Sequence, residues 1–363
     1  MLSRYYSYSQ FENYFGSVVK NLNGSTLKNL EIGQSVLKRS VYGLKIGSGK
    51  IKVLAWSQMH GNESSSTRAI CELLSSDDLY QIIENIQLYI IPVLNPDGAD
   101  AWTRGNANNV DLNRDAVSLS QPESILLQKV FDDFKPDYCF NLHGQRSIYG
   151  SEDGIMPAQI SFLAPAGDKR KLFKSARMQS MSIINDIHKQ IGKEVLGIIG
   201  RYNDDFNINC VGDFMMSKDV PTILFEAGHS GLDYSRDDAT LLLTKALKIA
   251  VNSVSNISLD QESTLTNYTA IPEMSASYVD ILIKNYKAAT GNQSLSIQYH
   301  EQVEDSCLYF VPILIGINRK DVLNGHRVID LEQDKHFKND LIVTGDLEIF
   351  SESLNIKIFA NYL

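Results

Sequence analysis

The chain has 363 residues, 43% of them hydrophobic, and its 34 basic and 43 acidic side chains give a formal net charge of −9. A chain of this length can bury a full core and, at roughly 100–200 residues per domain, should form about two domains, which excludes a disordered polymer. The acidic balance also argues against nucleic acid or an anionic membrane as the main partner, because both attract basic surfaces.

The first residues and the cysteines add to this picture. Residues 1–10 lack the apolar core of a signal peptide, and no apolar run approaches the roughly 20 residues of a membrane span. The four cysteines lie far apart without a CxxC pair, which is typical of free thiols in a reducing compartment. We therefore expect a cytoplasmic protein that binds neither nucleic acid nor membrane. Nothing in the composition predicts its oligomeric state.

Predicted strands and helices alternate from about residue 36 to residue 255. Residues 36–46 and 51–57 are β-rich, and the GSGK sequence at 47–50 between them predicts a hairpin turn. The pattern of apolar residues then predicts helices at 64–75, 121–134, 168–191 and 236–254 and strands at 86–92, 137–143, near 159–164 and at 221–226. This alternation predicts an α/β fold with a mixed, largely parallel central sheet and helices on both faces.

Two polar segments interrupt the pattern. Residues 95–120 predict a long loop, and loops beyond about 12–15 residues in a compact domain are usually functional. Residues 256–270 are polar without periodicity, which predicts a linker between a domain at 1–255 and a small β-rich domain at 271–363. Within the latter we expect strands at 294–298, 307–317, 341–343 and 347–358.

Three potential metal ligands follow predicted strands. His60 and Glu63 come just after the strand at 51–57, and His143 closes the strand at 137–143. Taken singly, either histidine has an alternative interpretation as a hydrogen-bonded structural residue. Because strands that end at the same sheet edge bring such side chains together, the three would form a three-ligand site with a fourth position for water, the pattern of catalytic zinc.

Three charged residues stand near the same sheet edge. Arg104 and Arg114 lie in the long Gly- and Asn-rich loop, where they are either solvated side chains or donors for a carboxylate and an oxyanion. Glu226 ends the strand at 221–226 and precedes a glycine. It is either a solvated edge residue or a base in a cleft, and a nearby metal-bound water favours the base.

In this order, the sequences HGNE, NPDG…TRGNANNVDLNR, NLHGQ and LFEAG resemble the zinc carboxypeptidases of the carboxypeptidase A-like (M14) family, bacterial-type branch. The resemblance covers about residues 30–255 and implies Zn²⁺ as the cofactor. It implies that His60, Glu63 and His143 bind the zinc and that the Asp111 carboxylate orients His60 from behind. It also implies that Arg104 stabilises the oxyanion, that Asn113 and Arg114 bind the terminal carboxylate of the substrate, and that Glu226 is the general base.

The chain departs from the digestive carboxypeptidases at three points. Asn62 occupies a position that those enzymes fill with arginine, and their substrate-capping tyrosine has no clear match. Only 80 positions separate Glu63 from His143, a short insertion that resembles the bacterial and acyl-amino-acid deacylase branches.

The resemblance implies a zinc-dependent hydrolase, a metallocarboxypeptidase that cleaves an amide bond next to a C-terminal carboxylate in a small peptide or acyl-amino-acid substrate. Two alternatives stay open. One is a zinc amidohydrolase or deacylase acting on acylated amino acids or peptidoglycan-type peptides, and the other is a catalytically inactive zinc-binding protein.

Overall fold

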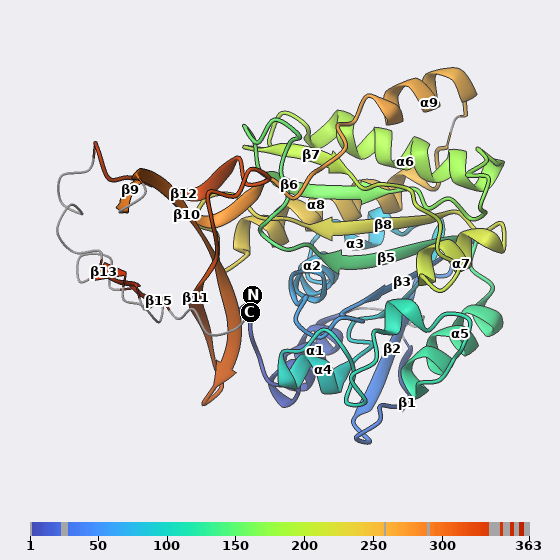
Figure 1. Cartoon of the computed structure of the whole chain (residues 1–363). Coiled ribbons are helices and arrows are strands. Elements are labelled where there is room, and N and C mark those ends of the chain that lie inside the picture. Colours follow the sequence, from blue (N-terminus) through green and yellow to red (C-terminus); the bar gives the residue numbers. More distant parts are fainter. Residues whose placement is uncertain are drawn as a thin grey trace.

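The structure, a computed structural model, describes residues 2–22, 28–257, 259–288, 291–333, 342–343, 349–351 and 356–358. An eight-stranded sheet with helices on both faces forms the larger part of the molecule (Figure 1). Its order is β1-β2-β4-β3-β5-β8-β6-β7, with the bounds β1 Lys28–Gln34, β2 Ser40–Ile46, β3 Ile51–Ser57, β4 Ile86–Ile91, β5 Tyr138–Gly144, β6 Ala158–Leu163, β7 Ile198–Arg201 and β8 Thr222–Ala227.

The centre of this sheet is parallel and its flanks are mixed. β4, β3, β5 and β8 pair in parallel, whereas β1–β2, β2–β4 and β8–β6 are antiparallel. Alternate residues of β3 pack into opposite layers, with Val53 and Ala55 on one face and Leu54 and Trp56 on the other. The predicted fold class is confirmed, and the carboxyl ends of β3, β5 and β8 lie at one edge.

Helices cover both faces of the sheet. One face carries α1 Tyr8–Asn21, α2 Ser65–Leu74, α3 Leu79–Ile82, α6 Ser175–Ile191 and α8 Asp237–Ser253, and the other carries α5 Pro122–Phe134 and α7 Val211–Ser217. Among the described residues, no helix combines the length and the apolar character needed to cross a membrane.

The predicted hairpin at residues 47–50 is wrong, because β4 lies between β2 and β3. The turn instead passes the start of β4, where the Gly49 amide donates to the Ile86 carbonyl oxygen at 3.2 Å. A Cβ at Gly49 would lie 1.8 Å from the carbonyl carbon of Asn85, so only glycine fits there. Long-range pairing decides this strand order, and local alternation of residues does not reveal it.

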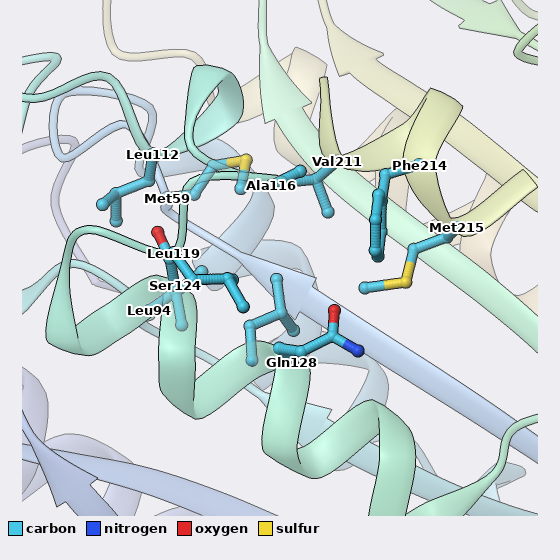
Figure 2. A pocket seen from close by; sticks show the side chains of 11 residues that line it. Met59, Leu94, Leu112, Ala116, Leu119, Ser124, Gln128, Val211, Phe214 and Met215 are labelled. Atoms are coloured by element: carbon cyan, nitrogen blue, oxygen red, sulfur yellow. The ribbon is translucent and has the colours of Figure 1, made fainter. Parts of the chain in front are cut away.

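The predicted loop at 95–120 contains two short helical segments, α4 Pro96–Ala101 and the 3-10 turn Leu112–Arg114. Asn95 caps α4 by accepting the Gly98 amide at 2.8 Å. Apolar side chains from the loop (Leu112, Ala116 and Leu119) and from two strand ends (Met59 and Leu94) pack against α5 and against Val211 and Met215 of α7 (Figure 2). This packing holds the segment against the sheet.

The segment predicted as a linker contains helix α9, Gln261–Thr269, which packs against α6. Only Thr264 and Tyr268 of α9 are buried, so its apolar stripe is too narrow for the sequence to show a period. The Tyr268 hydroxyl accepts the Ala164 amide at 3.0 Å. The segment predicted as a linker is therefore helical over these residues, and the division into two domains stays a prediction.

A second sheet follows, with the order β11-β10-β9-β12 (left in Figure 1). Its strands are β9 Tyr278–Ala288, β10 Gly291–Glu304, β11 Cys307–Ile317 and β12 Asn324–Asp330. Two of the predicted strands coincide with β10 and β11, whereas β9 and β12 were not predicted. The short strands β13 Ile342–Val343, β14 Ile349–Ser351 and β15 Ile356–Ile358 fall within the last two predicted ranges, whose other residues lie outside the described part of the chain.

Candidate metal centre and substrate cleft

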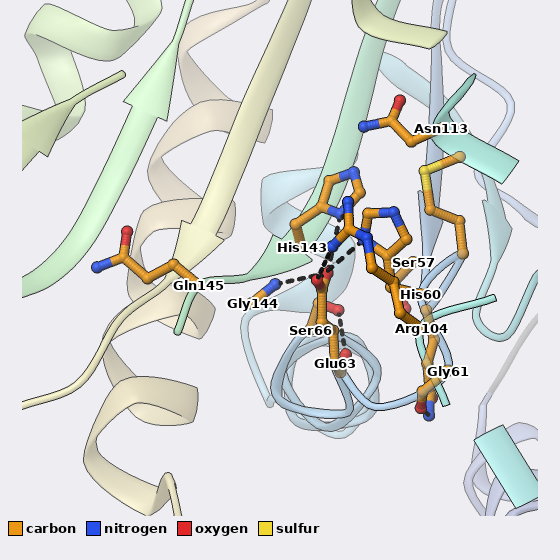
Figure 3. A network of polar contacts seen from close by, with 12 residues as sticks. Ser57, His60, Gly61, Glu63, Ser66, Arg104, Asn113, His143, Gly144 and Gln145 are labelled. Carbon is orange, nitrogen blue, oxygen red and sulfur yellow. Dashed lines mark hydrogen bonds and ion pairs between the residues drawn. The ribbon is translucent and has the colours of Figure 1, made fainter. Parts of the chain in front are cut away.

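Three side chains from the ends of two neighbouring parallel strands meet at one point (Figure 3). His60 and Glu63 lie between β3 and α2, and His143 lies on β5. The Glu63 carboxylate is 2.9 Å from the Nδ1 atom of each histidine, and the two Nδ1 atoms are 3.1 Å apart. The structure thus brings the three predicted ligands together.

The donor set suits a metal cation. The Nε2 atom of His60 is 2.9 Å from Asp111 Oδ1, so a proton on Nε2 binds that carboxylate and leaves the Nδ1 lone pair directed at Glu63 and His143. A carboxylate and two imidazole nitrogens that face one another need a cation or a proton between them. One ligand atom from each of the three residues lies within 4.8 Å of the others, which fits Zn²⁺ with two nitrogen ligands and one oxygen ligand.

The pKa shifts of Glu63 and His143 agree with this arrangement, whereas that of His60 does not: burial acts to lower the pKa of His60, but Glu63 and Asp111 outweigh it and raise the pKa. Burial acts to raise the pKa of Glu63, but His60 and His143 outweigh it and hold the pKa below its ordinary value. Burial lowers the pKa of His143 despite the attraction of Glu63. An ionised carboxylate beside a neutral imidazole is the protonation state that metal binding requires.

Two glycines allow the loops of the site to touch. A Cβ at Gly61 would lie 1.9 Å from the carbonyl carbon of Gly98, and a Cβ at Gly98 would lie 2.4 Å from Asn95 Nδ2. The Asn95 amide also donates to the Met59 and Gly105 carbonyl oxygens, at 3.1 Å each. The loop that carries Arg104 and Asp111 is therefore fixed against the turn that carries His60 and Glu63.

Arg104 and Glu226 lie beside the candidate ligands. Arg104 contacts Asp111 Oδ2 at 3.1 Å and Glu63 Oε1 at 3.4 Å, and half of its side chain is exposed. Glu226 is opposite His143 in the parallel register of β5 and β8, and its buried Oε2 atom has no hydrogen-bond partner among the described residues. Burial, followed by repulsion from Glu63, raises the pKa of Glu226 well above its ordinary value.

The spacing of these residues matches a known family. A family model described as zinc carboxypeptidase matches residues 17–191, a stretch that includes His60, Glu63, Asp111 and His143. Residues 17–191 of the chain match a zinc carboxypeptidase (M14) domain.

Curated proteins similar to this chain are carboxypeptidases. Carboxypeptidase SOL1 of Arabidopsis thaliana is 41% identical over 86 residues, which cover 21% of this chain and 18% of that protein. Carboxypeptidase 2 of Trichophyton rubrum is 28% identical over 125 residues, which cover 32% of this chain and 23% of that protein. The chain thus spans less than a quarter of the length of these two relatives.

Solved structures share the fold. A metallo-carboxypeptidase from Pseudomonas aeruginosa, in complex with (2-guanidinoethylmercapto)succinic acid, aligns with a TM-score of 0.57 at 18% identity over 69% of this chain and 70% of that one. A metallo-carboxypeptidase from Burkholderia cenocepacia aligns with a TM-score of 0.56 at 15% identity over 70% of each chain. At these identities the likeness concerns the fold alone.

A cavity of about 330 Å³ opens over the candidate metal centre of the zinc carboxypeptidase domain. Besides the candidate ligands and Glu226, its walls include Arg104, Asn113 and Arg114. Asn113 is fixed in place, since its Oδ1 accepts the Val211 amide at 3.0 Å. Arg114 is exposed, and its Nη1 donates to the Asn113 carbonyl oxygen at 2.8 Å. Every residue that the sequence places in the site lies at this cavity or, for Asp111, directly behind it.

The sequence did not identify two tyrosines that line the cavity, Tyr149 and Tyr202. Tyr202 lies just after β7, and its hydroxyl donates to Gln145 Oε1 at 3.2 Å. The ring of Tyr202 packs edge-on against Tyr149, with centroids 5.4 Å apart. Only the pairing of β6 with β7 brings Tyr202 to the cavity, and the sequence around Tyr202 does not reveal this pairing.

Proposed function

We propose that this chain is a zinc-dependent carboxypeptidase that hydrolyses the amide bond next to a free C-terminal carboxylate in a small peptide or acylated amino acid. One observation carries the proposal. A group of two histidines and a glutamate lies in a cavity that also holds Glu226 and the exposed guanidinium of Arg114.

His60, Glu63 and His143 would hold the zinc ion. When bound, zinc supplies a Lewis acid that lowers the pKa of a water molecule and polarises the scissile carbonyl. Asp111 positions the His60 ring through the contact at Nε2, which leaves the Nδ1 lone pair free for the metal.

The remaining residues act on the substrate. Arg114 and Asn113 bind the terminal carboxylate through charge-assisted hydrogen bonds, which places the last amide bond over the ligands. Glu226 accepts a proton from the attacking water and then transfers it to the leaving nitrogen as the C–N bond breaks. Arg104 donates hydrogen bonds to the oxygen that gains negative charge. The buried Glu226 carboxylate, with one oxygen free of partners, suits this exchange of a proton.

The test uses the purified full chain with two sets of substrates. Tripeptides with a free C-terminus are compared with the same tripeptides as C-terminal amides, and acylated amino acids form a second series that tests the deacylase alternative. We expect release of the last residue only when the carboxylate is free, loss of activity after chelation, and recovery with added zinc. Equal cleavage of free and amidated peptides would contradict the proposal, and no cleavage of any substrate by the zinc-loaded protein would favour the inactive alternative.

A further inference from the structure

A second cavity of about 330 Å³ adjoins the metal-centre cavity and shares Glu63, Arg104, Gly144, Gln145 and Arg146 with it, so that Arg146 stands at the boundary between the two. Its far wall belongs to the second sheet, because Gln298, Tyr299 and Glu301 of β10 line it. The other walls come from the first residues of the chain, the segment after β5 and the segment before α8. We call it the β10 cavity.

The two carboxylates on the far side of the β10 cavity are already satisfied. Glu301 accepts from Arg4 at 2.5 Å and from the Trp102 indole at 3.1 Å. Asp280 accepts from the Tyr234 hydroxyl at 2.9 Å and from the Tyr299 amide at 2.7 Å. Neither carboxylate therefore requires a cationic ligand.

Two guanidinium groups of the same cavity are not satisfied. Arg236 is only 6% exposed, it donates to the Gly228 carbonyl oxygen, and its Nε has no acceptor. No carboxylate of the described residues forms an ion pair with Arg236, and Arg146 is exposed at the cavity without an ion pair or hydrogen bond to the described residues. Burial of a charge without an ion-pair partner is unfavourable, so the arrangement suits an anionic ligand.

The backbone and the charge of Arg236 support this reading. Arg236 has a φ of 57°, a conformation that non-glycine residues adopt rarely and that tends to persist at functional sites. Burial, and to a smaller extent Arg4, lower the pKa of Arg236 to about 10, while the more distant carboxylates of Glu301, Asp280 and Asp233 act to raise it. The guanidinium therefore still carries its charge at neutral pH.

We propose that the β10 cavity binds the acyl side of the substrate and selects an acyl group that bears a second carboxylate, held by Arg236 and Arg146. This inference rests on the proposed function, which assigns the other cavity to the C-terminal residue. A guanidinium binds a carboxylate in a bidentate fork, and an isosteric amide cannot replace its charge. The second sheet is then part of the substrate-binding site.

The carboxylate can belong to an acidic side chain or to a dicarboxylic acyl group, and two substrate pairs separate these sources. One pair is acetyl-Glu-X and acetyl-Gln-X, and the other is succinyl-X and succinamoyl-X, with X the best leaving residue. We expect the wild type to prefer the acid in at least one pair by about tenfold or more in kcat/KM, as the loss of a charged hydrogen bond implies. Arg236→Gln and Arg146→Gln should reduce that preference severalfold, whereas Arg170→Gln, an exposed arginine outside both cavities, should keep it.

A binding measurement keeps this inference separate from the proposed function. Calorimetry measures the binding of two acid–amide pairs to the zinc-loaded protein, N-acetylglutamate with N-acetylglutamine and succinate with succinamate. This measurement does not depend on turnover. If the protein hydrolyses no substrate but binds an acid more tightly than its amide, the proposed function is rejected and the anion site in the β10 cavity is supported. Equal binding within both pairs would overturn the site, as would an acid preference that Arg146→Gln leaves unchanged. Because Arg146 is exposed, that variant keeps the test decisive if Arg236→Gln does not fold.

Discussion

The two adjoining cavities are built in different ways. The metal-centre cavity takes its candidate ligands from the ends of β3 and β5, and neighbouring strand ends and one fixed loop supply the rest. The β10 cavity joins several segments that are far apart in the chain, from Arg4 to Glu301. If the two proposals hold, the residues for the chemistry come from the central sheet and its loops, whereas the choice of acyl group also depends on how the second sheet packs against them.

The largest expected effect concerns the proton transfer. Glu226→Gln keeps the shape of the side chain but removes its basicity, so kcat should fall by about 10²–10⁴-fold. The bound zinc should match that of the wild type, since Glu226 is outside the candidate ligand set. Kinetics and metal analysis on the same preparation measure both quantities. Undiminished turnover would remove Glu226 from the mechanism.

The next prediction tests whether the two cavities bind different parts of the substrate. Arg114→Gln should lower kcat/KM for peptides with a free C-terminus by roughly ten- to a hundredfold, the range for a lost hydrogen bond to a charged group. Preference for an acidic acyl group should not change, because Arg114 does not line the β10 cavity. Arg170→Gln is the matched control. A variant that loses both selectivities would show that the cavities do not act separately.

An effect of similar size, but on metal affinity, is expected at Asp111. Asp111→Asn weakens the contact to His60 Nε2, and loss of such a partner typically costs about 10–100-fold in metal affinity. Competition with a chromophoric chelator measures this change, with the exposed Asp153→Asn as the control. Unchanged affinity would mean that Asp111 does not orient the ligand.

The smallest effect concerns the junction between the sheets. His229 is buried there and His326 is half-buried, with ring centroids 4.3 Å apart. Burial lowers the pKa of His229 and of His326, and the charge of Arg236 lowers both further. Asp280 acts in the opposite direction on the pKa of His326 but does not outweigh burial. Below the unfolded pKa of about 6.5, the unfolded chain binds protons that the folded chain does not, so stability falls as the pH falls.

Urea unfolding tests this dependence. The midpoint should be lower at about pH 5.5 than at about pH 7.5 in the wild type, and the difference should shrink in His326→Gln. Glutamine at this position can still donate to the Ser147 carbonyl oxygen, which accepts from His326 Nε2 at 2.7 Å. An identical pH dependence in both proteins would exclude His326 as its source.

The sequence predicts what is local and periodic. Strands β3, β5 and β8 are apolar on both faces, so continuous apolar runs mark them, and His60, Glu63, His143 and Glu226 stand at or just beyond their ends. The convergence of the first three follows from the parallel pairing of these strands. The chemical roles of these residues stay predictions until the variants are measured.

What depends on distant pairing could not be predicted in this way. Insertion of β4 between β2 and β3, the docking of α9 and the position of Tyr202 all arise from contacts between remote segments. Arg236 belongs to no motif, and only its burial beside the second sheet distinguishes it from an ordinary arginine at a helix start.

The contact between Gly61 and Gly98 also fixes the geometry around the cavity before anything binds. Their backbones meet without room for a methyl group, and the Asn95 amide joins the Met59 and Gly105 carbonyl oxygens. The proposed oxyanion donor Arg104 therefore belongs to the same connected unit as His60 and Glu63. A substrate or an inhibitor that fits this cavity should lose little free energy in ordering it.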